Sequence, residues 1–160
     1  MKIGSMETGD IQAGDAKFAI IACRFNGEIV NRLLQGATDT LLKNGVDAQS
    51  IDTIHVPGAF ELPLTALQLA KTNKYAAIIA LGCVIRGDTP HFDFVAGECA
   101  RGIMQVGLET GIPVVFGVLT TDTPEQANLR SQLNGDNKGV DAALCALEMK
   151  NTLNSILVAE

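Results

Sequence analysis

The amino-acid sequence predicts an α/β fold, a three-layer α/β/α sandwich around a four-stranded parallel sheet. Short apolar runs alternate with stretches of helical period, which is typical of βαβ units whose sheet is buried on both faces. A length of 160 residues fits one domain, and no repeat, linker or low-complexity stretch divides the chain. We therefore expect one domain over residues 1–160, with residues 1–15 as an N-terminal arm because they lack clear periodicity.

Four apolar runs of strand length predict the sheet. The third run is the longest, and its end is expected to project beyond the neighbouring strands. The predicted strands are Phe18–Cys23, Ile51–Val56, residues 76–85 and residues 113–119.

Three helices are expected between these strands. After the first strand, apolar residues recur at steps of three and four up to Asn44-Gly45, where glycine can adopt the left-handed conformation that ends a helix. A second helix is centred on residues 64–70, with Pro63 near its first turn. A third, long helix covers residues 90–110, and its apolar stripe consists of Phe92, Val95, Cys99, Ile103 and Val106.

Two more helices follow the fourth strand. Thr123 and Pro124 are typical of an N-cap and a first helical position, and Gln126 can complete a capping box. This helix is short because the Asn-Gly-Asp-Asn sequence at residues 134–137 interrupts it. The last helix is expected to begin near Gly139.

The charge of the chain argues against nucleic acid as a partner. Twelve Lys and Arg against 18 Asp and Glu give a net charge of −6, and no basic run could follow a phosphate backbone. No apolar run approaches the ~20 residues that a membrane helix requires. The N-terminus has no apolar signal-peptide region, so we expect a soluble, cytoplasmic protein without a membrane partner.

Residue types that bind metals are sparse. His55 and His91 are the only histidines, and the four cysteines match no metal-ligand spacing, so no metal site is predicted. His55 lies within the second strand, where we expect a structural role. Because free cysteine packs as a small hydrophobe, we expect reduced core residues at Cys23, Cys83, Cys99 and Cys145.

The residues after the third strand are typical of an anion site. Ligands of parallel α/β sheets bind outside the carboxyl ends of the strands. Thr89-Pro90 suggests an N-cap and a first helical position, and the free backbone N–H groups and dipole of such a turn favour a phosphate. Asp88 would repel a phosphate unless only its backbone N–H faces the ligand. The alternative is a loop that merely starts a helix.

Three side chains near the strand ends each have a functional interpretation. His91 can pass protons to and from a bound phosphorylated substrate, or it is a surface residue. Glu61 accepts hydrogen bonds from the N–H edge of a heterocycle, or it is a simple first-turn acid. Phe25 offers a flat face for stacking a planar ring. No nucleophile lies at the spacing of a known triad, so Ser-His-Asp and Cys-His chemistry has no support.

Five segments, in one order, resemble the lumazine synthase family. They are RFN, VPGAFELP, ALGCVIRGDTPHFD, VVFGVLTTDTPEQA and NKGVDAAL, and the match covers residues 16–149. The resemblance implies a flavodoxin-like fold and a transferase of the penultimate step of riboflavin biosynthesis. In that reaction 5-amino-6-(D-ribitylamino)uracil condenses with 3,4-dihydroxy-2-butanone 4-phosphate to give 6,7-dimethyl-8-ribityllumazine, phosphate and water, without a cofactor.

The resemblance also implies roles for residues of this chain. His91 would transfer protons. The pyrimidine substrate would contact Phe25, Ala59, Phe60, Glu61, Phe116 and, through the backbone, Cys83, Val84 and Ile85. The butanone phosphate would contact Asp88, Thr89, Arg130 and, as a second cation, Lys138. In the family Phe116 and Arg130 come from the neighbouring subunit, so each site would lie between two subunits.

The assembly implied by the resemblance is a homopentamer, alone or packed into a decamer or an icosahedral 60-subunit shell, with riboflavin synthase as a further candidate partner. Many shell-forming relatives carry a Gly-Thr-Lys-Ala-Gly-like turn between the last two helices. Here residues 131–136 differ, with Asn134 in place of the lysine, although the turn length is compatible with a shell. Two alternatives stay open: a non-catalytic protein that binds flavin or lumazine, and a shell-forming protein of the same fold.

Overall fold

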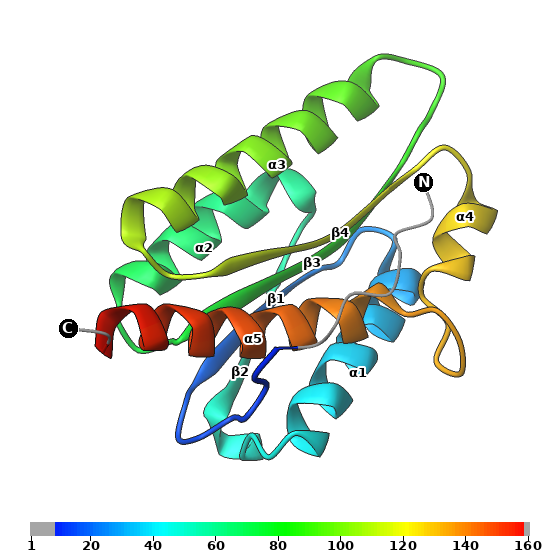
Figure 1. Ribbon diagram of the computed structural model, residues 1–160. Helices are drawn as coiled ribbons and strands as arrows, with labels where there is room; N and C mark the ends of the chain where they lie inside the picture. Colours follow the sequence, from blue (N-terminus) through cyan, green and yellow to red (C-terminus); the bar gives the residue numbers. More distant parts are fainter. Residues whose placement is uncertain (1–8, 159–160) are drawn as a thin grey trace.

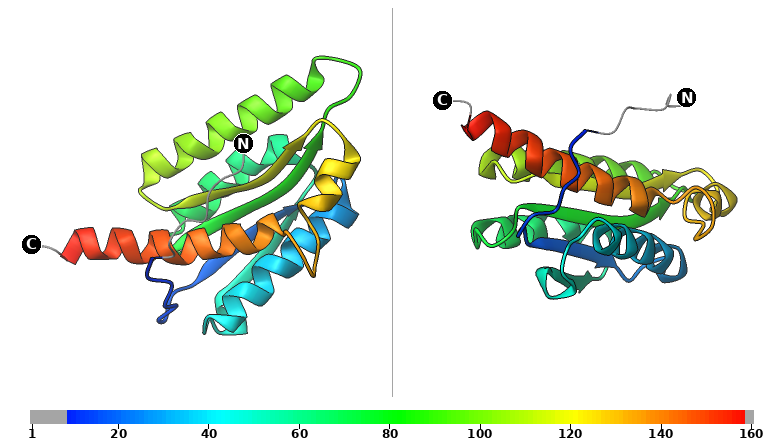
Figure 2. Two further views of the ribbon diagram at one scale, coloured as in Figure 1. Left: turned by 45° about the vertical axis from the view of Figure 1, so that its right-hand side comes forward. Right: turned by 60° about the horizontal axis from the view of Figure 1, so that its bottom comes forward.

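The computed structural model describes residues 9–158, which form an α/β/α sandwich (Figure 1). The elements are β1 (Phe18–Cys23), α1 (Gly27–Lys43), β2 (Ile51–Val56), α2 (Leu62–Lys71), β3 (Ala77–Ile85), α3 (His91–Thr110), β4 (Val114–Thr121), α4 (Pro124–Leu129) and α5 (Lys138–Val158), with short 3-10 turns at Ala48–Ser50 and Ala59–Glu61. The four strands are parallel, in the order β2-β1-β3-β4. Helices α1 and α5 cover one face of the sheet, and α2 and α3 cover the other (Figure 2). The predicted fold class is confirmed.

The strands match the sequence prediction except at β4. The bounds of β1 and β2 are those predicted, and β3 begins one residue later. The predicted end of β4 at residue 119 is wrong, because Thr120 and Thr121 pair with Val84 and Ile85 of β3. The pairing of β1 with β3 already stops at Leu81. The end of β3 therefore projects beyond β1, as predicted, but it stays paired with β4 up to Ile85.

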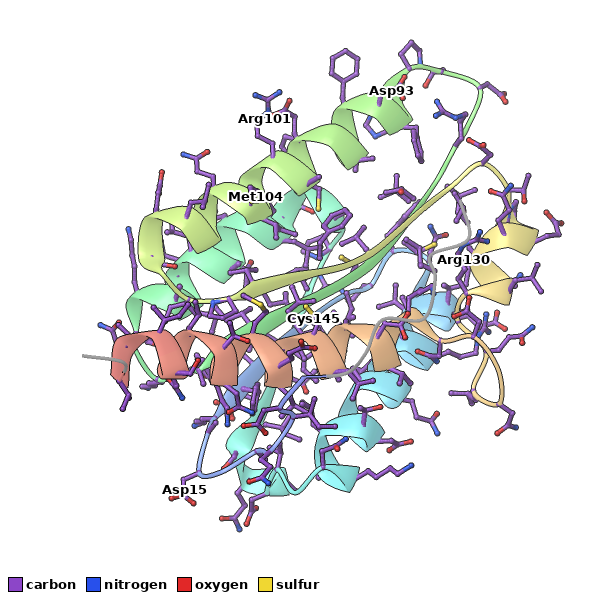
Figure 3. The ribbon with its side chains drawn as sticks, viewed as in Figure 1. Asp15, Asp93, Arg101, Met104, Arg130 and Cys145 are labelled. Carbon is purple, nitrogen blue, oxygen red and sulfur yellow. The ribbon has the colours of Figure 1, made fainter. Side chains whose placement is uncertain are left out.

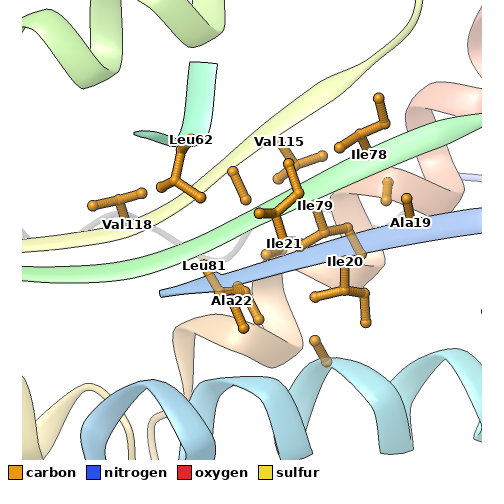
Figure 4. Close-up of a cluster of buried hydrophobic side chains, with 14 of the residues drawn as sticks. Ala19, Ile20, Ile21, Ala22, Leu62, Ile78, Ile79, Leu81, Val115 and Val118 are labelled. Carbon is orange, nitrogen blue, oxygen red and sulfur yellow. The ribbon is translucent and has the colours of Figure 1, made fainter. Parts of the chain in front are cut away.

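The core lies on both faces of the two central strands. All six residues of β1 and the first seven of β3 are buried. Ile20 of β1 points towards α1, whereas Leu62 of α2 covers the opposite face of the sheet (Figure 4). A strand that is buried on both faces has a continuous apolar sequence, which explains why these two strands could be predicted.

Two helix ends follow the predicted signals, whereas α4 already ends at Leu129, before the predicted interruption at residues 134–137. Gly45 after α1 has a φ of 94°, the left-handed conformation that glycine allows. Thr123 caps α4, since its side chain accepts a hydrogen bond from the Gln126 N–H at 3.2 Å. The side-chain oxygen of Gln126 accepts from the Asp122 N–H at 2.8 Å, one residue before the capping-box position.

The predicted N-terminal arm is described only from residue 9, and residues 1–8 lie outside the described part. The buried Lys150 of α5 donates from Nζ to the carbonyls of Gln12, at 2.9 Å, and Ala13. Asn151 Nδ2 donates to the carbonyls of Asp10 and Gln12, both at 2.9 Å. Residues 10–13 are thus held against α5 of the same chain.

The cysteines agree with the prediction in three of four cases. Cys23, Cys83 and Cys99 are buried and free. Cys145 is free but exposed on α5 (Figure 3), so its predicted core position is wrong. The buried residues of this helix fall at 139, 142–143, 146–147 and 150, and residue 145 faces another side at 3.6 residues per turn. Among residues 9–158 no helix is both long and apolar enough to span a membrane.

Candidate active site

A cavity of about 670 Å³ opens at the carboxyl ends of β1, β2 and β3. The chain passes from β1 to β2 on one side and returns to β3 on the other, so the cavity lies where the strand order reverses. Such reversal points are the usual ligand sites of open α/β sheets. The cavity is lined by Phe25, Pro57, Gly58, Ala59, Phe60, Glu61, Cys83, Val84, Ile85, Gly87, Thr89, His91, Phe92, Phe94 and Val95.

Most side chains that the sequence assigned to a site lie at this cavity. The wall contains Thr89, His91 and every predicted pyrimidine residue from the three strand ends. Asp88 has an exposed side chain between the lining residues Gly87 and Thr89. Four predicted residues are not part of the wall: Phe116, Asp88, Arg130 and Lys138.

Phe25 presents an exposed ring on a fixed backbone. Its side chain is 71% exposed, yet its N–H donates to the Pro57 carbonyl at 3.0 Å. The next residue, Asn26, has a left-handed backbone with φ 53° and donates from Nδ2 to the Cys83 carbonyl at 2.8 Å. These bonds join the ends of β1, β2 and β3. No role was predicted for Asn26, whose hydrogen-bond partner lies 57 residues away in the chain.

Glu61 ends the 3-10 turn that precedes α2. Its N–H donates to the Gly58 carbonyl at 3.2 Å, which fixes the turn at the cavity edge. Within residues 9–158 its carboxylate takes part in no salt bridge, so both oxygens are available to a ligand. Ala59 is buried in the same turn, whereas Phe60 is 59% exposed.

Burial disfavours ionisation of the thiols near the cavity floor. Burial raises the pKa of Cys83, which lines the cavity, to about 11. Burial, with smaller contributions from Cys99, Glu61 and Cys83, raises the pKa of Cys23 to about 12. A thiol must ionise to react, so both stay protonated at neutral pH.

The loop between β3 and α3 differs by one residue from the predicted cap. Helix α3 begins at His91, and Pro90 rather than Thr89 occupies the N-cap position. The Thr89 hydroxyl nevertheless accepts a hydrogen bond from the His91 N–H at 3.4 Å, which is the kind of bond that the predicted cap would make. The first turn of a 20-residue helix still faces the cavity through His91.

Arg86 fixes this helix start and was missed by the sequence analysis. Its guanidinium binds Asp122 Oδ1 at 2.9 Å and Asp93 Oδ1 at 3.2 Å, and lies 4.2 Å from the ring centroid of Phe92. Asp93 lies at the start of α3 (Figure 3). Arg86 therefore holds the two residues that follow His91. The only sequence signal was an arginine directly after a strand.

The aromatic wall on α3 corrects the predicted apolar stripe of that helix. Cys99, Ile103 and Val106 are buried as expected. Phe92 and Val95 are only partly buried, and they line the cavity together with Phe94, which is 67% exposed. The first turns of α3 stand away from the sheet (Figure 1), so they have no core to cover.

The two predicted phosphate cations lie next to each other, on the α4–α5 turn. Arg130 follows α4 (Figure 3) and is exposed, with Nη1 donating to the Gln126 carbonyl at 3.0 Å. The Lys138 N–H donates to the Arg130 carbonyl at 2.9 Å. Hydrogen bonds to Asp141 and Asp136 raise the pKa of Lys138, so it is charged at neutral pH.

Phe116 and His55 both lie on edge strands, outside the cavity wall. Phe116 is in the middle of β4, and 41% of its side chain is exposed. His55 is exposed on β2.

The described residues contain no group of three or more His, Cys, Asp or Glu side chains that could hold a metal ion.

The model of one protein family, 6,7-dimethyl-8-ribityllumazine synthase, matches residues 15–154. The matched region covers every strand and all the cavity residues.

Proposed function

The chain belongs to the 6,7-dimethyl-8-ribityllumazine synthase family, and we propose that the cavity at the ends of β1, β2 and β3 is its active site. The protein is an enzyme of riboflavin biosynthesis, a transferase that condenses 5-amino-6-(D-ribitylamino)uracil with 3,4-dihydroxy-2-butanone 4-phosphate. The observation that carries the assignment of the site is the position of Phe25, Glu61, Thr89 and His91 around one cavity.

The pyrimidine binds at the β1 and β2 side of this cavity. Its ring stacks on Phe25, whose backbone is held by Pro57 and whose neighbour Asn26 is tied to β3. The carboxylate of Glu61 accepts hydrogen bonds from N–H groups of the heterocycle. Ala59 and Phe60 flank the ring and its ribityl chain, and the backbone of residues 83–85 forms the floor.

The butanone phosphate binds at the start of α3. Gly87 has open space around it, so a phosphate can approach the backbone of the loop. Thr89 and the backbone N–H of Asp88 contact the phosphate, and the dipole of the 20-residue helix favours its negative charge. Arg86 neutralises the nearby carboxylates of Asp93 and Asp122.

Phe116, Arg130 and Lys138 serve the cavity of a neighbouring subunit. This proposal is supported by the exposure of Phe116 and Arg130 and by the position of all three residues outside the cavity wall of their own chain; Lys138 is half-buried and paired with Asp136 and Asp141. An exposed aromatic ring and two adjacent cations would complete a site for a heterocycle and a phosphate. The proposed assembly is a homo-oligomer, with a pentamer as its unit.

The proposed mechanism needs few protein groups. The 5-amino group of the pyrimidine attacks the ketone and loses water to form an imine. Phosphate then leaves by β-elimination, and the second amine closes the new ring with loss of water. Holding the two reactants together can contribute about 7–11 kcal/mol, and proton transfer by His91 a further factor of about 10²–10⁴.

The decisive test is to mix the purified protein with both substrates and follow lumazine fluorescence. The uncatalysed condensation of the same mixture is the control. The proposed activity predicts a faster rise, proportional to protein concentration. A rate equal to the control, together with tight lumazine binding, would instead identify a non-catalytic binding protein.

The shared site has its own test, which uses two variants with impaired activity. His91→Ala and Arg130→Ala subunits are produced separately and by co-expression, at equal total protein. If a site combines His91 of one subunit with Arg130 of the next, some sites in mixed oligomers are intact and activity returns. Activity no higher than the sum of the separate variants would place both residues in one subunit's site.

A further inference from the structure

The guanidinium of Arg32, on α1, is bonded to the turn that carries the two proposed phosphate cations. Its Nε donates to the Ser131 carbonyl at 3.1 Å, and Nη2 donates to Asn128 Oδ1 at 2.6 Å and Ser131 Oγ at 3.0 Å. Ser131 is fully buried, and its hydroxyl also donates to the Ala127 carbonyl at 3.1 Å. Arginine suits this place because its planar group presents several donors in a fixed geometry. Arg32 therefore joins α1 to the end of α4.

Asn137, which is 4% exposed, makes a second connection between the same elements. Its Nδ2 donates to the backbone carbonyl of Arg32 at 3.0 Å. Its Oδ1 accepts from the N–H groups of Gly139 at 2.9 Å and Val140 at 3.3 Å, and so caps the start of α5. A side chain at Gly139 would collide with the Leu33 carbonyl, so the backbones of α1 and α5 are in close contact.

The two connections lie directly beside the two proposed phosphate cations. Ser131 and Asn137 form an antiparallel bridge, and Arg130 and Lys138 are the residues directly outside it, joined by their own backbone hydrogen bond. Inside the bridge the Gln132 N–H donates to the Asp136 carbonyl at 2.9 Å, which closes the turn. The backbone positions of both cations are therefore set by hydrogen bonds to α1 that are partly buried or exposed.

We propose that Arg32 and Asn137 are positioning residues for the phosphate group of the four-carbon substrate, acting through Arg130 and Lys138. The inference rests on the proposed role of those two cations. Arg130 is exposed and follows a helix of only six residues, so that helix alone holds it weakly. A binding group moved by ~1 Å can cost about 10²-fold in rate, so a fixed turn matters.

The test compares variants at Arg32 with a control at another partner of the same guanidinium. Arg32→Ala removes every bond to the turn, and Arg32→Lys keeps the charge but cannot make all three contacts. Glu28→Gln is the control, because Glu28 binds Arg32 Nη1 at 3.3 Å, has a side chain that is 92% exposed, and does not touch the turn. Asn137→Asp keeps the oxygen that caps α5 but loses the donor to α1.

The measurements are KM for each substrate and the inhibition constant of inorganic phosphate, with thermal unfolding of each variant. We expect Arg32→Ala to raise KM for the butanone phosphate and the phosphate inhibition constant about tenfold, less than the ~10²-fold possible for a misplaced group. KM for the pyrimidine should stay within about twofold of the original, since its proposed contacts do not involve this turn. Arg32→Lys and Asn137→Asp should give smaller increases in KM for the butanone phosphate and in the phosphate inhibition constant, and Glu28→Gln should change neither.

Arg130→Ala is measured in parallel to separate the two proposals. If Arg130→Ala leaves KM for the butanone phosphate unchanged, the proposed function of the cations is wrong. If Arg130→Ala raises it but Arg32→Ala does not, only the positioning inference fails. It also fails if Arg32→Ala raises both KM values equally, which would indicate general damage. In the double variant, Arg32→Ala should add less than it does alone, because its effect passes mainly through Arg130.

Discussion

Asn26 offers the sharpest test of how Phe25, on whose ring the pyrimidine is proposed to stack, is held in position. Its side chain donates to the Cys83 carbonyl at 2.8 Å, and its backbone is left-handed, with φ 53° and ψ 41°. A lost hydrogen bond of this kind costs about 0.5–1.5 kcal/mol. An alanine in the left-handed region costs a further ~1–2 kcal/mol, because its Cβ approaches the following carbonyl. Asn26→Ala should therefore destabilise the chain by about 1.5–3.5 kcal/mol.

Asn26→Gly is the matched variant, since it loses the same bond but tolerates the backbone conformation. Its extra cost is the greater freedom of glycine in the unfolded chain, about 0.4–1 kcal/mol. The assay is denaturant unfolding at one fixed protein concentration, because assembly adds to apparent stability. Both variants should raise KM for the pyrimidine more than KM for the butanone phosphate. The reasoning is refuted if glycine destabilises as much as alanine, or if neither variant changes KM for the pyrimidine.

Three further predictions concern the site and the core. His91→Ala should lower kcat by about 10²–10⁴-fold and leave residual activity, whereas Arg130→Ala should chiefly raise KM for the butanone phosphate; unchanged steady-state kinetics in both would contradict the site. Arg86→Ala should lower kcat because the first turn of α3 loses its ion pairs, and Arg86→Lys should restore part of the lost kcat. Equal kcat in the original protein and both variants would show that the first turn of α3 does not depend on Arg86. Burial raises the pKa of Cys99 to about 11 from its ordinary 9.0, so the folded state keeps a proton that the unfolded state loses above pH 9. Stability is then full below pH 9 and falls towards pH 11, by at most about 1.4 kcal/mol per pH unit for this residue. The denaturant midpoint of Cys99→Val should fall less steeply between pH 8 and 10.5 than that of the original protein. An identical fall in both proteins would exclude Cys99 as a cause.

The parts of the fold that could be predicted from the sequence are those that depend on nearby residues. The bounds of β1 and β2 and the cap of α4 by Thr123 follow from apolar runs and turn signals a few residues apart. The end of β4 was missed because the apolar run that predicted the strand stops at Leu119, although threonine is itself common in strands. Thr120 and Thr121 extend the strand because β3 offers them partners, and this pairing joins residues 36 apart in the chain.

The same distinction applies to the cavity. The rule that ligands bind at the ends of parallel strands selected most of its wall, and the family resemblance supplied the individual roles. The side chains that hold this wall in place have distant partners. Asn26 binds a carbonyl 57 residues away, Arg86 a carboxylate 36 residues away, and Asn137 a carbonyl 105 residues away. No local pattern marks such bonds, because each partner is an ordinary backbone or surface group until the chain folds.

These holding contacts bear on the proposed assembly. Within one chain, Asn26 and Arg86 fix the open cavity, while Arg32 and Asn137 fix the turn with the two cations. Both halves of the proposed shared site are therefore held by contacts within a single chain. Docking of such preformed surfaces costs little conformational entropy. An isolated subunit should consequently keep the structure of both halves and yet be inactive, since the cations and the cavity of one chain lie on different parts of its surface.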